Sequence, residues 1–461
     1  MTAATPALVA RLQELMSAGR MAQALALLEA CPLQDQAAEV AYLHAVAAAQ
    51  CGQRGRAQAA LAQCLRQAPA HPGAHFQGAA IALQDGDVDA AHRGFHAAAR
   101  AAPGWAEAHY NLAVVQAMQG DFAAAEHSYR AALQAKPQLV QAANNLANLL
   151  SERGALADAQ QLMQSALAAA PDFAIGWCTL GRIFFQLRRF TPAIEALRRS
   201  LALDAGQPAA WENLGEALQL AGDTAAAAEA FAEALALNPS SPSLAFKLDT
   251  LRGGQPSRPP DAFVRRLFDD MAGDFDQWLV ERLGYRLPEQ LGQYLPAAAG
   301  LDVLDLGCGT GLAAPALRPL ARRLEGADLS PKMLAKASAR GLYDALHPAS
   351  LQVQLAQEAE AWDLLLAADV FIYVGALEDV FALSASALRS GGWLLLSIEV
   401  LEGDHAPGFR LQPSGRYAHA TSYLRRLALE HGFDVELDVP IELRRERETM
   451  LPGRVLRLRR R

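Results

Sequence analysis

Apolar positions in the first half of the chain recur every 34 residues. A small residue and, four positions later, a large one keep this step through six units, at Ala57, Ala91, Ala125, Ala159, Ala193 and Ala227 and at Leu61, Phe95, Tyr129, Met163, Leu197 and Phe231. Residues four apart share one face of a helix, so this pair predicts a helix that packs on a neighbour. Apolar residues of a preceding helix recur at Leu112, Leu146, Leu180 and Leu214.

Glycine and proline keep the same step and predict where the helices end. Glycine, which ends a helix in the left-handed conformation, stands at Gly52, Gly86, Gly120, Gly154 and Gly222, with Arg188 in the remaining place. Proline follows the second helix at Pro69, Pro103, Pro137, Pro171 and Pro239, with Ala205 in the remaining place. Six helix–turn–helix units are therefore predicted from about residue 38 to 241, preceded by a degenerate unit with Gly19 and Ala24.

The pattern changes after a segment rich in glycine and proline. A closing helix is expected over Leu244–Leu251, and residues 252–260 contain no apolar side chain and predict a linker. The expected domains are thus 1–251, a repeat superhelix, and 261–461. In the second domain strands alternate with helices, which predicts a mostly parallel sheet covered on both faces.

The first strand is predicted by Val303, Leu304 and Leu306, and a glycine turn follows at Gly307, Gly309 and Gly311. Apolar residues then return at helical spacing from Leu312 to Leu324. The second strand ends near Asp328, a third lies at or near 342–346, a fourth begins at Trp362, and a fifth follows a glycine turn at 390–392. Because ligands of such sheets bind at the carboxyl ends of the strands, Asp305, Asp328, Asp369, Tyr373 and Glu399 are expected around one crevice.

The chemistry of this crevice follows from its acids. The glycine spacing differs from the dinucleotide fingerprint, and Asp305 precedes the first glycine by two residues. Asp305 suits a ligand with a positively charged amino acid moiety, and Asp328 suits two ribose hydroxyls. S-adenosyl-L-methionine has both groups. The alternative is a structural strand–turn–helix without a ligand.

The region from Asp302 to Leu312 and from Gly326 to Leu334 resembles class I methyltransferases. The resemblance implies a Rossmann-like α/β domain that binds S-adenosyl-L-methionine. Family members often carry an acid after the third strand that binds the adenine amino group. Ser350 stands there instead, so Leu329 and Met333 are expected to pack on adenine. The expected cofactor-binding set is Asp305, Gly307, Cys308, Gly309, Gly311, Asp328, Leu329, Met333, Asp369 and Phe275.

Two further segments are expected to border the crevice. Phe268, Met271, Phe275, Trp278 and Leu279 fall on one face of a helix that would cover the cofactor or simply pack on the sheet. A loop before a helix that Thr421 or Ser422 would cap carries Tyr417 and His419. We expect His419 to accept a proton and Tyr373 or Tyr417 to orient the acceptor, whereas the alternative is a loop packed by aromatic side chains. The basic tail, with Val455, Leu456 and Leu458, is expected to form an edge strand.

The repeats resemble the tetratricopeptide repeat, most closely over Ala106–Leu139. Asn111, Asn145 and Asn213 share one repeat position, with Thr179 in the fourth unit, and would bind the backbone of an extended peptide on the concave face. They would otherwise be ordinary solvated helix residues. The whole chain resembles bacterial methyltransferases with amino-terminal tetratricopeptide repeats.

Composition limits the remaining choices. A formal charge of −8 argues against a nucleic-acid-coating protein, and the five cysteines show no metal or disulfide spacing. The start lacks a signal-peptide pattern and no apolar run would span a membrane, so we expect a cytoplasmic protein without a metal. We expect a methyltransferase whose repeats recruit a protein. The alternatives are a small-molecule methyltransferase whose repeats only mediate oligomerisation, and a non-catalytic adaptor with a vestigial cofactor domain.

Overall fold

The computed structural model describes residues 6–29, 32–403, 407–412, 414–446 and 449–461. The chain divides into two compact units, Met1–Leu237 and Asn238–Arg461. The helix α15, Pro242–Leu251, was expected to close the repeat array and falls in the second unit. Cys31, one of the five cysteines, lies outside the described residues, and the other four are free thiols.

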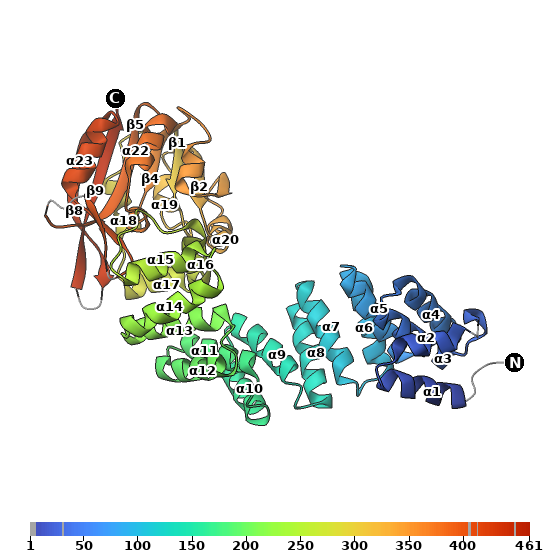
Figure 1. Cartoon of the computed structure of the whole chain (residues 1–461). Coiled ribbons are helices and arrows are strands. Elements are labelled where there is room, and N and C mark those ends of the chain that lie inside the picture. Colours follow the sequence, from blue (N-terminus) through green and yellow to red (C-terminus); the bar gives the residue numbers. More distant parts are fainter. Residues whose placement is uncertain (1–5, 30–31, 404–406, 413, 447–448) are drawn as a thin grey trace. The chain divides into compact units, whose positions relative to one another are not determined.

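The first unit consists of helices that pack in consecutive antiparallel pairs (Figure 1). In chain order they are α1 Pro6–Ser17, α2 Met21–Glu29, α3 Ala38–Gln50, α4 Arg54–Gln67, α5 Pro72–Gln84, α6 Val88–Ala101, α7 Ala106–Met118, α8 Phe122–Ala135, α9 Val140–Glu152, α10 Leu156–Ala169, α11 Ala174–Gln186, α12 Phe190–Leu203, α13 Pro208–Ala221 and α14 Thr224–Leu237. The predicted packing is confirmed, because the six alanines of the 34-residue step are fully buried and the six large residues are at most 5% exposed.

The turn between the two helices of a unit has the predicted left-handed residue. Gly52, Gly86, Gly120, Gly154 and Gly222 all have positive φ, and so does Arg188, at 59°. The unit that contains Arg188 turns in the same way without a glycine. Arg188 therefore adopts the left-handed conformation, which is energetically unfavourable for an L-residue with a side chain. An aspartate carboxylate then caps the second helix in three units, where Asp87, Asp121 and Asp223 accept a hydrogen bond from the amide three residues on.

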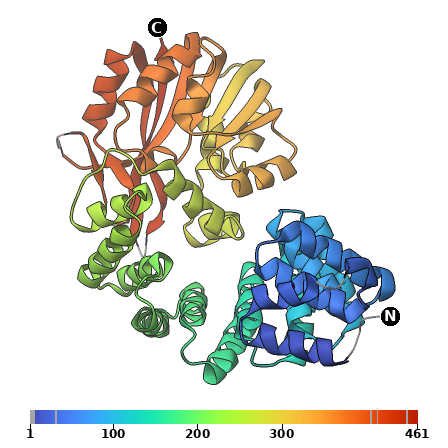
Figure 2. The ribbon, with the colours of Figure 1, turned by 45° about the vertical axis from the view of Figure 1, so that its right-hand side comes forward.

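A second recurring contact joins successive units and was not predicted. His75, His109, Trp177 and Trp211 stand at one repeat position near the start of α5, α7, α11 and α13. The Nε1 of each tryptophan donates to the carbonyl oxygen six residues earlier, and the Nε2 of each histidine lies 2.7–3.0 Å from the equivalent oxygen. These contacts satisfy carbonyl groups of the loop that leaves the previous unit, where no helix partner exists. Figure 2 shows the helices from a second side.

The second unit contains one nine-stranded sheet in its described part, with helices against it (Figure 1). The strands are β1 Leu301–Leu306, β2 Ala321–Asp328, β3 Ala345–Pro348, β4 Trp362–Ala367, β5 Leu388–Val400, β6 Phe409–Leu411, β7 Tyr417–His419, β8 Phe433–Glu446 and β9 Thr449–Arg460. β3, β2, β1, β4 and β5 are parallel neighbours in that order, β9 pairs antiparallel with both β5 and β8, and β7 pairs with β5 and β6.

The carboxyl-terminal tail was predicted as an edge strand, and this prediction is wrong. β9 lies between β5 and β8, and its residues Val455, Leu456 and Leu458 are at most 1% exposed. The arginines that alternate with them are accommodated by partners, as when Arg457 donates to the carbonyl oxygens of Tyr294 and Leu295. Alternation of charged and apolar residues is compatible with an interior strand when the charged residues find such partners.

The segment after the glycine turn also differs from its prediction. Only α19, Ala314–Leu317, is helical, and β2 already begins at Ala321, so the apolar residues up to Leu324 belong partly to a strand. The helices that follow are α20 Pro331–Ala339, α21 Leu351–Leu355, α22 Glu378–Ala387 and α23 Thr421–Glu430. The N-cap of α23 is Ala420, without a side-chain cap, so neither Thr421 nor Ser422 has the predicted role.

The entry segment is broken rather than one helix. It consists of α16 Asp261–Met271, the short α17 Phe275–Gln277, and a π-helical turn at Trp278–Arg282, before α18 Leu287–Gln290. The break falls at Gly273, a residue that weakens a helix. As a result, aromatic side chains of both parts can reach one cavity.

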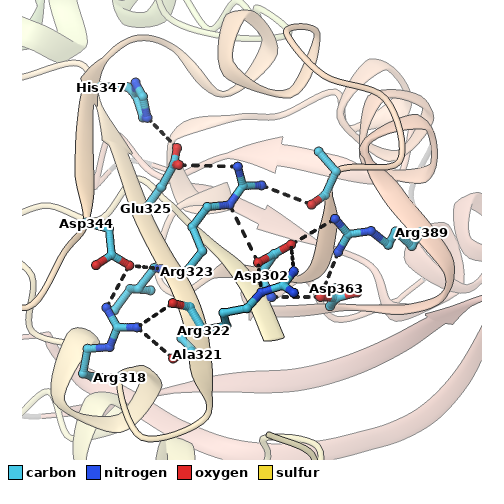
Figure 3. Close-up of polar contacts among 12 residues, drawn as sticks. Asp302, Arg318, Ala321, Arg322, Arg323, Glu325, Asp344, His347, Asp363 and Arg389 are labelled. Atoms are coloured by element: carbon cyan, nitrogen blue, oxygen red, sulfur yellow. Dashed lines mark hydrogen bonds and ion pairs between the residues drawn. The ribbon is translucent and has the colours of Figure 1, made fainter. Parts of the chain in front are cut away.

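Charged side chains join the amino-terminal ends of the parallel strands, opposite the end that carries the cavity described below. Asp302 accepts hydrogen bonds from Arg322 and Arg389, and Arg389 also contacts Asp363 (Figure 3). Glu325 bridges Arg323 and His347. The arginines lower the pKa of Asp302, chiefly through the hydrogen bond from Arg322. Each charge in this network has a counter-charge, so we assign it to stability.

Candidate active site

The second unit has a cavity at the carboxyl ends of β1, β2 and β4. Asp305, Gly307, Gly309, Asp328 and Leu329 line it from β1 and β2. The other lining residues come from the chain around α16, from the π-helical turn and from the ends of later strands, and include Arg258, Phe268, Phe275, Trp278, Tyr285, Ser350, Gln352, Asp369, Tyr373, Arg416 and Arg444. The cavity thus lies where the sequence predicted a crevice.

The glycine turn brings backbone close to the cavity. Gly307, Gly309 and Gly311 have φ of 64°, 54° and 82°, a range that glycine adopts without strain. A Cβ atom on Gly307 would lie 2.7 Å from Val370, whereas one on Gly309 would meet no atom within 4 Å. Gly307 is therefore required by packing and Gly309 by its backbone angle. Gly311 does not line the cavity. It packs beside Tyr343 and Arg340, so it stands behind the cavity wall rather than at the place its predicted cofactor contact requires.

Asp305 is a nearly fully buried carboxyl group on β1. The Tyr343 hydroxyl donates a hydrogen bond to its Oδ2 at 2.6 Å. Burial raises the pKa of Asp305 to about 7, although the Tyr343 hydrogen bond opposes that rise. Tyr343 was predicted only as part of a strand, so its contact with Asp305 is a site feature that sequence analysis missed.

Asp328, at the end of β2, holds the glycine turn as well as facing the cavity. Its Oδ2 accepts from the backbone amide of Gly309 at 2.9 Å, and its Oδ1 accepts from that of Ser330 at 2.8 Å. Burial raises the pKa of Asp328, and these amide hydrogen bonds oppose the rise. Each carboxylate oxygen accepts about two hydrogen bonds, which leaves capacity for a ligand.

The adjoining wall follows β2 and β3. Leu329, Ser350, Leu351 and Gln352 line it, and the Ser350 hydroxyl accepts from the Val353 amide at the start of α21. Met333, which was expected to pack on adenine, is fully buried on α20 and does not line the cavity. Its helix turns it toward the protein interior, so Leu329 is the one of the two that can contact a ligand.

The opposite wall contains an ion-pair cluster. Arg444 of β8 is 1% exposed and donates to Asp369 Oδ1 at 2.7 Å and to Glu399 Oε2 at 2.9 Å. Asp369 has a φ of 59°, and its amide donates to the Ser397 hydroxyl at 2.8 Å. The neighbouring Tyr285 is buried, and its pKa is raised well above the ordinary value by burial and by the Asp369 charge.

The expected catalytic residues separate in the structure. Tyr373 lines the cavity, where its ring packs edge-on against Phe268. His419 and Tyr417 do not line it and are fully buried. His419 Nε2 lies 2.9 Å and 3.0 Å from the carbonyl oxygens of Val374 and Gly375, and the Tyr417 hydroxyl donates to the Pro256 carbonyl.

His419 therefore lacks the access to an acceptor that its predicted role requires. Burial lowers its pKa to about 4, so it is neutral near pH 7 and serves as a hydrogen-bond donor to the backbone. Tyr417 likewise fixes a loop. The alternative of a loop packed by aromatic side chains describes both residues.

The segment predicted as a linker, residues 252–260, makes hydrogen bonds within the second unit. Ser257 O accepts from the amides of Gly375 and Ala376, both at 2.9 Å, and the Gln255 side chain pairs with the backbone of Leu411. We call residues 255–259 the strap. Arg258 and Pro259 of the strap line the cavity. They are held there because the Ser257 carbonyl accepts from two backbone amides of the loop after β4.

The entry segment is fixed beside the strap. Asp269 of α16 accepts from the Ser330 hydroxyl at 2.5 Å, and Asp276 of α17 contacts Thr310 of the glycine turn. Arg340 joins Asp276 at 2.6 Å. These contacts hold Phe268 and Phe275 at the cavity, and the covering of a cofactor by this segment stays a prediction.

The three asparagines of the array are half-buried and have partners within the first unit. Asn111 Nδ2 donates to the Glu107 carbonyl at 2.8 Å, Asn145 Nδ2 lies 3.4 Å from both the Tyr110 and Tyr129 hydroxyls, and Asn213 Nδ2 lies 3.8 Å from Cys178 Sγ. They occupy A helices α7, α9 and α13, as predicted. Their structural contacts were not predicted and use part of their hydrogen-bonding capacity.

Comparisons with known proteins assign both halves. The profile of the family described as "Methyltransferase domain" matches residues 304–396, and that of "Tetratricopeptide repeat" matches 76–140, 118–174, 144–208 and 178–242. The chain therefore combines tetratricopeptide repeats with a carboxyl-terminal methyltransferase domain of Rossmann-like fold, and its curated relatives are methyltransferases.

Two such relatives each match about a quarter of this chain or less. Human methyltransferase-like protein 27 is 38% identical over 118 residues, which is 24% of this chain and 46% of that protein. The ubiquinone biosynthesis O-methyltransferase of Burkholderia cenocepacia is 28% identical over 106 residues, 22% of this chain and 44% of that protein. The chain thus spans less than half of the length of these relatives.

Two solved structures are each similar to part of the chain. One, from Listeria monocytogenes, is described as a proposed S-adenosylmethionine-dependent methyltransferase, with 20% identity, a TM-score of 0.32, and coverage of 38% of this chain and 96% of that one. The other is YrrB, described as a tetratricopeptide-repeat protein with an unusual peptide-binding site, with 15% identity, a TM-score of 0.36, and coverage of 41% and 97%.

The described residues contain no helix with both the length and the apolar character that crossing a membrane requires. Within the same residues, no group of three or more His, Cys, Asp or Glu side chains is arranged to hold a metal ion.

Proposed function

We propose that the chain is an S-adenosyl-L-methionine-dependent methyltransferase whose repeat array recruits a protein partner or substrate. The observation that carries the proposal is the cavity bordered by Asp305, the glycine turn and Asp328. This cofactor needs a carboxyl group for its amino acid part, an open backbone turn beside its sulfonium, and a second carboxylate for its ribose. The matched methyltransferase family and the relatives support the same cofactor.

The residues present fit the cofactor, with one contact for each of its parts. Asp305 would bind the amino group, Gly307, Cys308 and Gly309 would face the methionine portion, and Asp328 would accept from the ribose hydroxyls. Leu329 would pack on adenine, and Ser350 or Gln352 supplies the polar group at its edge. Phe275 would cover the cofactor. When bound, S-adenosyl-L-methionine supplies a methyl group on a positively charged sulfur atom.

The chain's own contribution to the reaction is alignment and exclusion of water. Methyl transfer is an in-line displacement, so holding the two reactants in line accounts for much of the acceleration. Phe268, Phe275 and Trp278 make one side of the cavity apolar. Tyr373 and Asp369 stand on the wall opposite Asp328 and would orient the acceptor.

The first test is binding of S-adenosyl-L-methionine to the whole chain by calorimetry, with an expected Kd on the order of micromolar. Asp328→Ala should weaken binding by about 1.5–3 kcal/mol, the scale of hydrogen bonds to a charged group. Because Asp328 also holds the Gly309 and Ser330 amides, Asp328→Asn should lose less. No heat with the folded wild-type chain rejects the cofactor assignment, and unchanged affinity of Asp328→Ala rejects the ribose contact.

The array is proposed to bind an extended segment of a protein through Asn111, Asn145 and Asn213. In Asn111 and Asn213 the contacts given above use one amide hydrogen, which leaves the other hydrogen and the carbonyl oxygen for a partner. The Asn145 side chain contacts two tyrosine hydroxyls and the Asn144 amide, so Asn145→Ala would disturb the array itself. The double variant Asn111→Ala/Asn213→Ala is therefore the cleaner test.

This double variant should lose roughly thirtyfold in affinity for a partner purified with the wild-type chain, at about 1 kcal/mol per asparagine. Its melting temperature should stay close to that of the wild type, since alanine is favoured in helices. Gln161→Ala, an exposed amide on the second helix of a unit, is the matched control. Full partner affinity in the folded double variant would leave oligomerisation as the role of the repeats.

A further inference from the structure

We propose that Arg258, carried by the strap, binds an anionic group of the methyl acceptor, so that the acceptor of this cavity bears a carboxylate or a phosphate. The inference rests on the proposed function and concerns a second group of the acceptor, apart from the atom that is methylated. The strap precedes every strand of the sheet in the chain, and the cofactor assignment leaves it unused.

The strap adjoins the half of the sheet that the cofactor assignment leaves free. In the sheet order β3-β2-β1-β4-β5-β7-β6, the acids proposed to bind the cofactor belong to β1 and β2. The strap makes its hydrogen bonds to the loop after β4, to β6 and to β7, through Gly375, Leu411 and Tyr417. Its side of the cavity therefore suits the second reactant rather than the cofactor.

The backbone of Arg258 is fixed on both sides. Before it, the Ser257 carbonyl accepts from two amides at 2.9 Å, and the Pro256 carbonyl accepts from the Tyr417 hydroxyl at 2.8 Å. After it, Pro259 is buried, and a residue that precedes proline is restricted to extended conformations. The chain thus presents Arg258 to the cavity without further ordering of the backbone, which favours binding.

The Arg258 guanidinium lines the cavity and has no hydrogen bond or ion pair with any residue that the structure describes. By contrast, Arg444 of the same cavity donates to Asp369 at 2.7 Å and to Glu399 at 2.9 Å. A guanidinium carries five donors in a planar fork that matches a carboxylate or a phosphate. The counter-charge of Arg258 therefore comes from solvent or from a ligand.

Two neighbours of the strap favour an anion at this place. Arg416, the residue before Tyr417, also lines the cavity, and its positive charge attracts an anion whatever other contacts it makes. Arg416 opposes the rise in the pKa of Tyr373 that burial causes, so its guanidinium lies near the Tyr373 hydroxyl. Because that pKa is raised, the hydroxyl keeps its proton near pH 7 and can donate it to an anion.

Apolar side chains beside the strap strengthen an ion pair at Arg258. An exposed ion pair contributes little, because water and salt screen it. Val264 and Phe268 of α16, the helix that follows the strap, line the cavity, and the Phe268 ring packs edge-on against Tyr373 with centroids 5.0 Å apart. A ligand that covers these side chains excludes water from the ion pair. We therefore expect the acceptor to join an apolar body to its anionic group.

One acidic side chain opposes an anion at this place. Asp261 lines the cavity three residues after Arg258 and lies in the first turn of α16. The positive end of the helix macrodipole stabilises a negative charge there, and Asp261 forms no ion pair with Arg258 in the described part of the chain. Asp261 therefore lowers the affinity for an anion without occupying the guanidinium.

The test measures binding of three small probes to the whole chain saturated with S-adenosylhomocysteine, by ligand-observed NMR. Benzoate and phenyl phosphate are the carboxylate and phosphate arms, and benzamide is the neutral arm with the same ring. We expect one anion to bind at least about tenfold more tightly than benzamide, and the tighter anion identifies the group. Benzamide binding as tightly as that anion, or neither anion binding below roughly 10 mM, overturns the inference.

Arg258→Gln is the decisive variant, because it removes the charge, keeps a hydrogen-bond donor and breaks no contact of the folded chain. Its affinity for the tighter anion should fall about tenfold or more, whereas its affinity for benzamide should stay the same. Arg258→Lys should keep part of the anion preference, since it keeps the charge without the planar fork. Asp261→Asn should bind the anion more tightly. Unchanged anion affinity in Arg258→Gln overturns the inference, as does weaker anion binding by folded Asp261→Asn.

Controls separate the possible failures. Arg265→Gln is the same exchange at an exposed position of α16 that does not line the cavity, and it should change no probe. Equal losses in Arg265→Gln and Arg258→Gln would indicate a general effect of net charge and overturn the inference. A loss of S-adenosylhomocysteine affinity in Arg258→Gln would mean that Arg258 holds the cofactor and would overturn the inference alone. No S-adenosylhomocysteine binding by the wild type would reject the proposed function and the inference together.

Discussion

Asp305 is a carboxyl group whose charge is set by two opposing effects. Burial disfavours its ionised form, and the Tyr343 hydroxyl stabilises that form by donating at 2.6 Å. The result is a pKa of about 7. A bound ammonium group beside it would favour the ionised form, so cofactor binding at lower pH must release a proton.

This balance predicts that affinity for S-adenosyl-L-methionine rises with pH. The acid form of Asp305 predominates below its pKa and must lose its proton to bind the amino group. From pH 6 to pH 7 the ionised fraction, and with it the affinity, should rise about fivefold. Calorimetry across this range measures it, and Asp305→Asn should be weaker and flatter with pH. Tyr343→Phe should shift the midpoint upward, and a flat wild-type profile would exclude Asp305 from binding.

The residues that sequence analysis placed wrongly are those whose role depends on what surrounds them. His419 and Tyr417 have side chains suited to catalysis, and no local pattern records that Val374, Gly375 and Pro256 offer carbonyl groups beside them. Asp305 and Asp328 were placed correctly because the adjacent glycine turn fixes which end of the strand they occupy. Tyr343 was missed because its contact joins the connection before β3 to Asp305 within β1.

At the scale of elements, the array was predicted in detail because its information repeats. Six copies of one pattern average out the local exceptions, and even the unit without a glycine keeps the turn, at Arg188. The sheet was predicted in its parallel half, where β4 and β5 contain continuous apolar runs. The third strand was expected at or near 342–346, and β3 begins at Ala345. β9 was predicted at the sheet edge because its arginines suggested exposure to solvent. The helix that contains α19 was predicted too long because its apolar spacing continues into the start of β2.

Arg188 shows what the missing glycine costs. The left-handed conformation costs a residue with a side chain about 1–2 kcal/mol of folded-state stability. Glycine avoids this cost, but it also makes the unfolded chain more flexible, which offsets part of the gain. Arg188→Gly should therefore stabilise the first unit by about 0.5–1 kcal/mol, seen as a shift of the urea midpoint. Gly154→Arg, the reverse exchange at the same repeat position, should destabilise it by a similar amount. Equal midpoints for all three proteins would contradict the strain assigned to this turn.

At the scale of the molecule, the strap bears on where the catalytic unit begins. The expected domain began at 261, directly after a linker. However, Gln255, Pro256 and Ser257 make hydrogen bonds to Leu411, Tyr417, Gly375 and Ala376. The absence of apolar residues predicted a linker. The backbone hydrogen bonds of this segment could not be predicted, because every residue has a carbonyl group and the sequence does not show which of them accept. We propose that the functional catalytic unit begins before the strap, near residue 238.

Two fragments test this boundary. Residues 238–461 should fold and bind S-adenosyl-L-methionine with the affinity of the whole chain. Residues 261–461 lack the strap, so the Gly375 and Ala376 amides and the Tyr417 hydroxyl lose their acceptors, at about 1 kcal/mol each. For a domain of this size the melting temperature should fall by roughly 6–12 °C, and removal of Arg258 and Pro259 opens the cavity.

A fragment 261–461 that melts and binds like 238–461 would show that the strap is dispensable and that the boundary lies at the linker after all. Adding a strap mutant, Gln255→Ala in 238–461, separates the side-chain pairing with Leu411 from the backbone contacts, and only a small loss is expected because the Ser257 and Pro256 carbonyls remain.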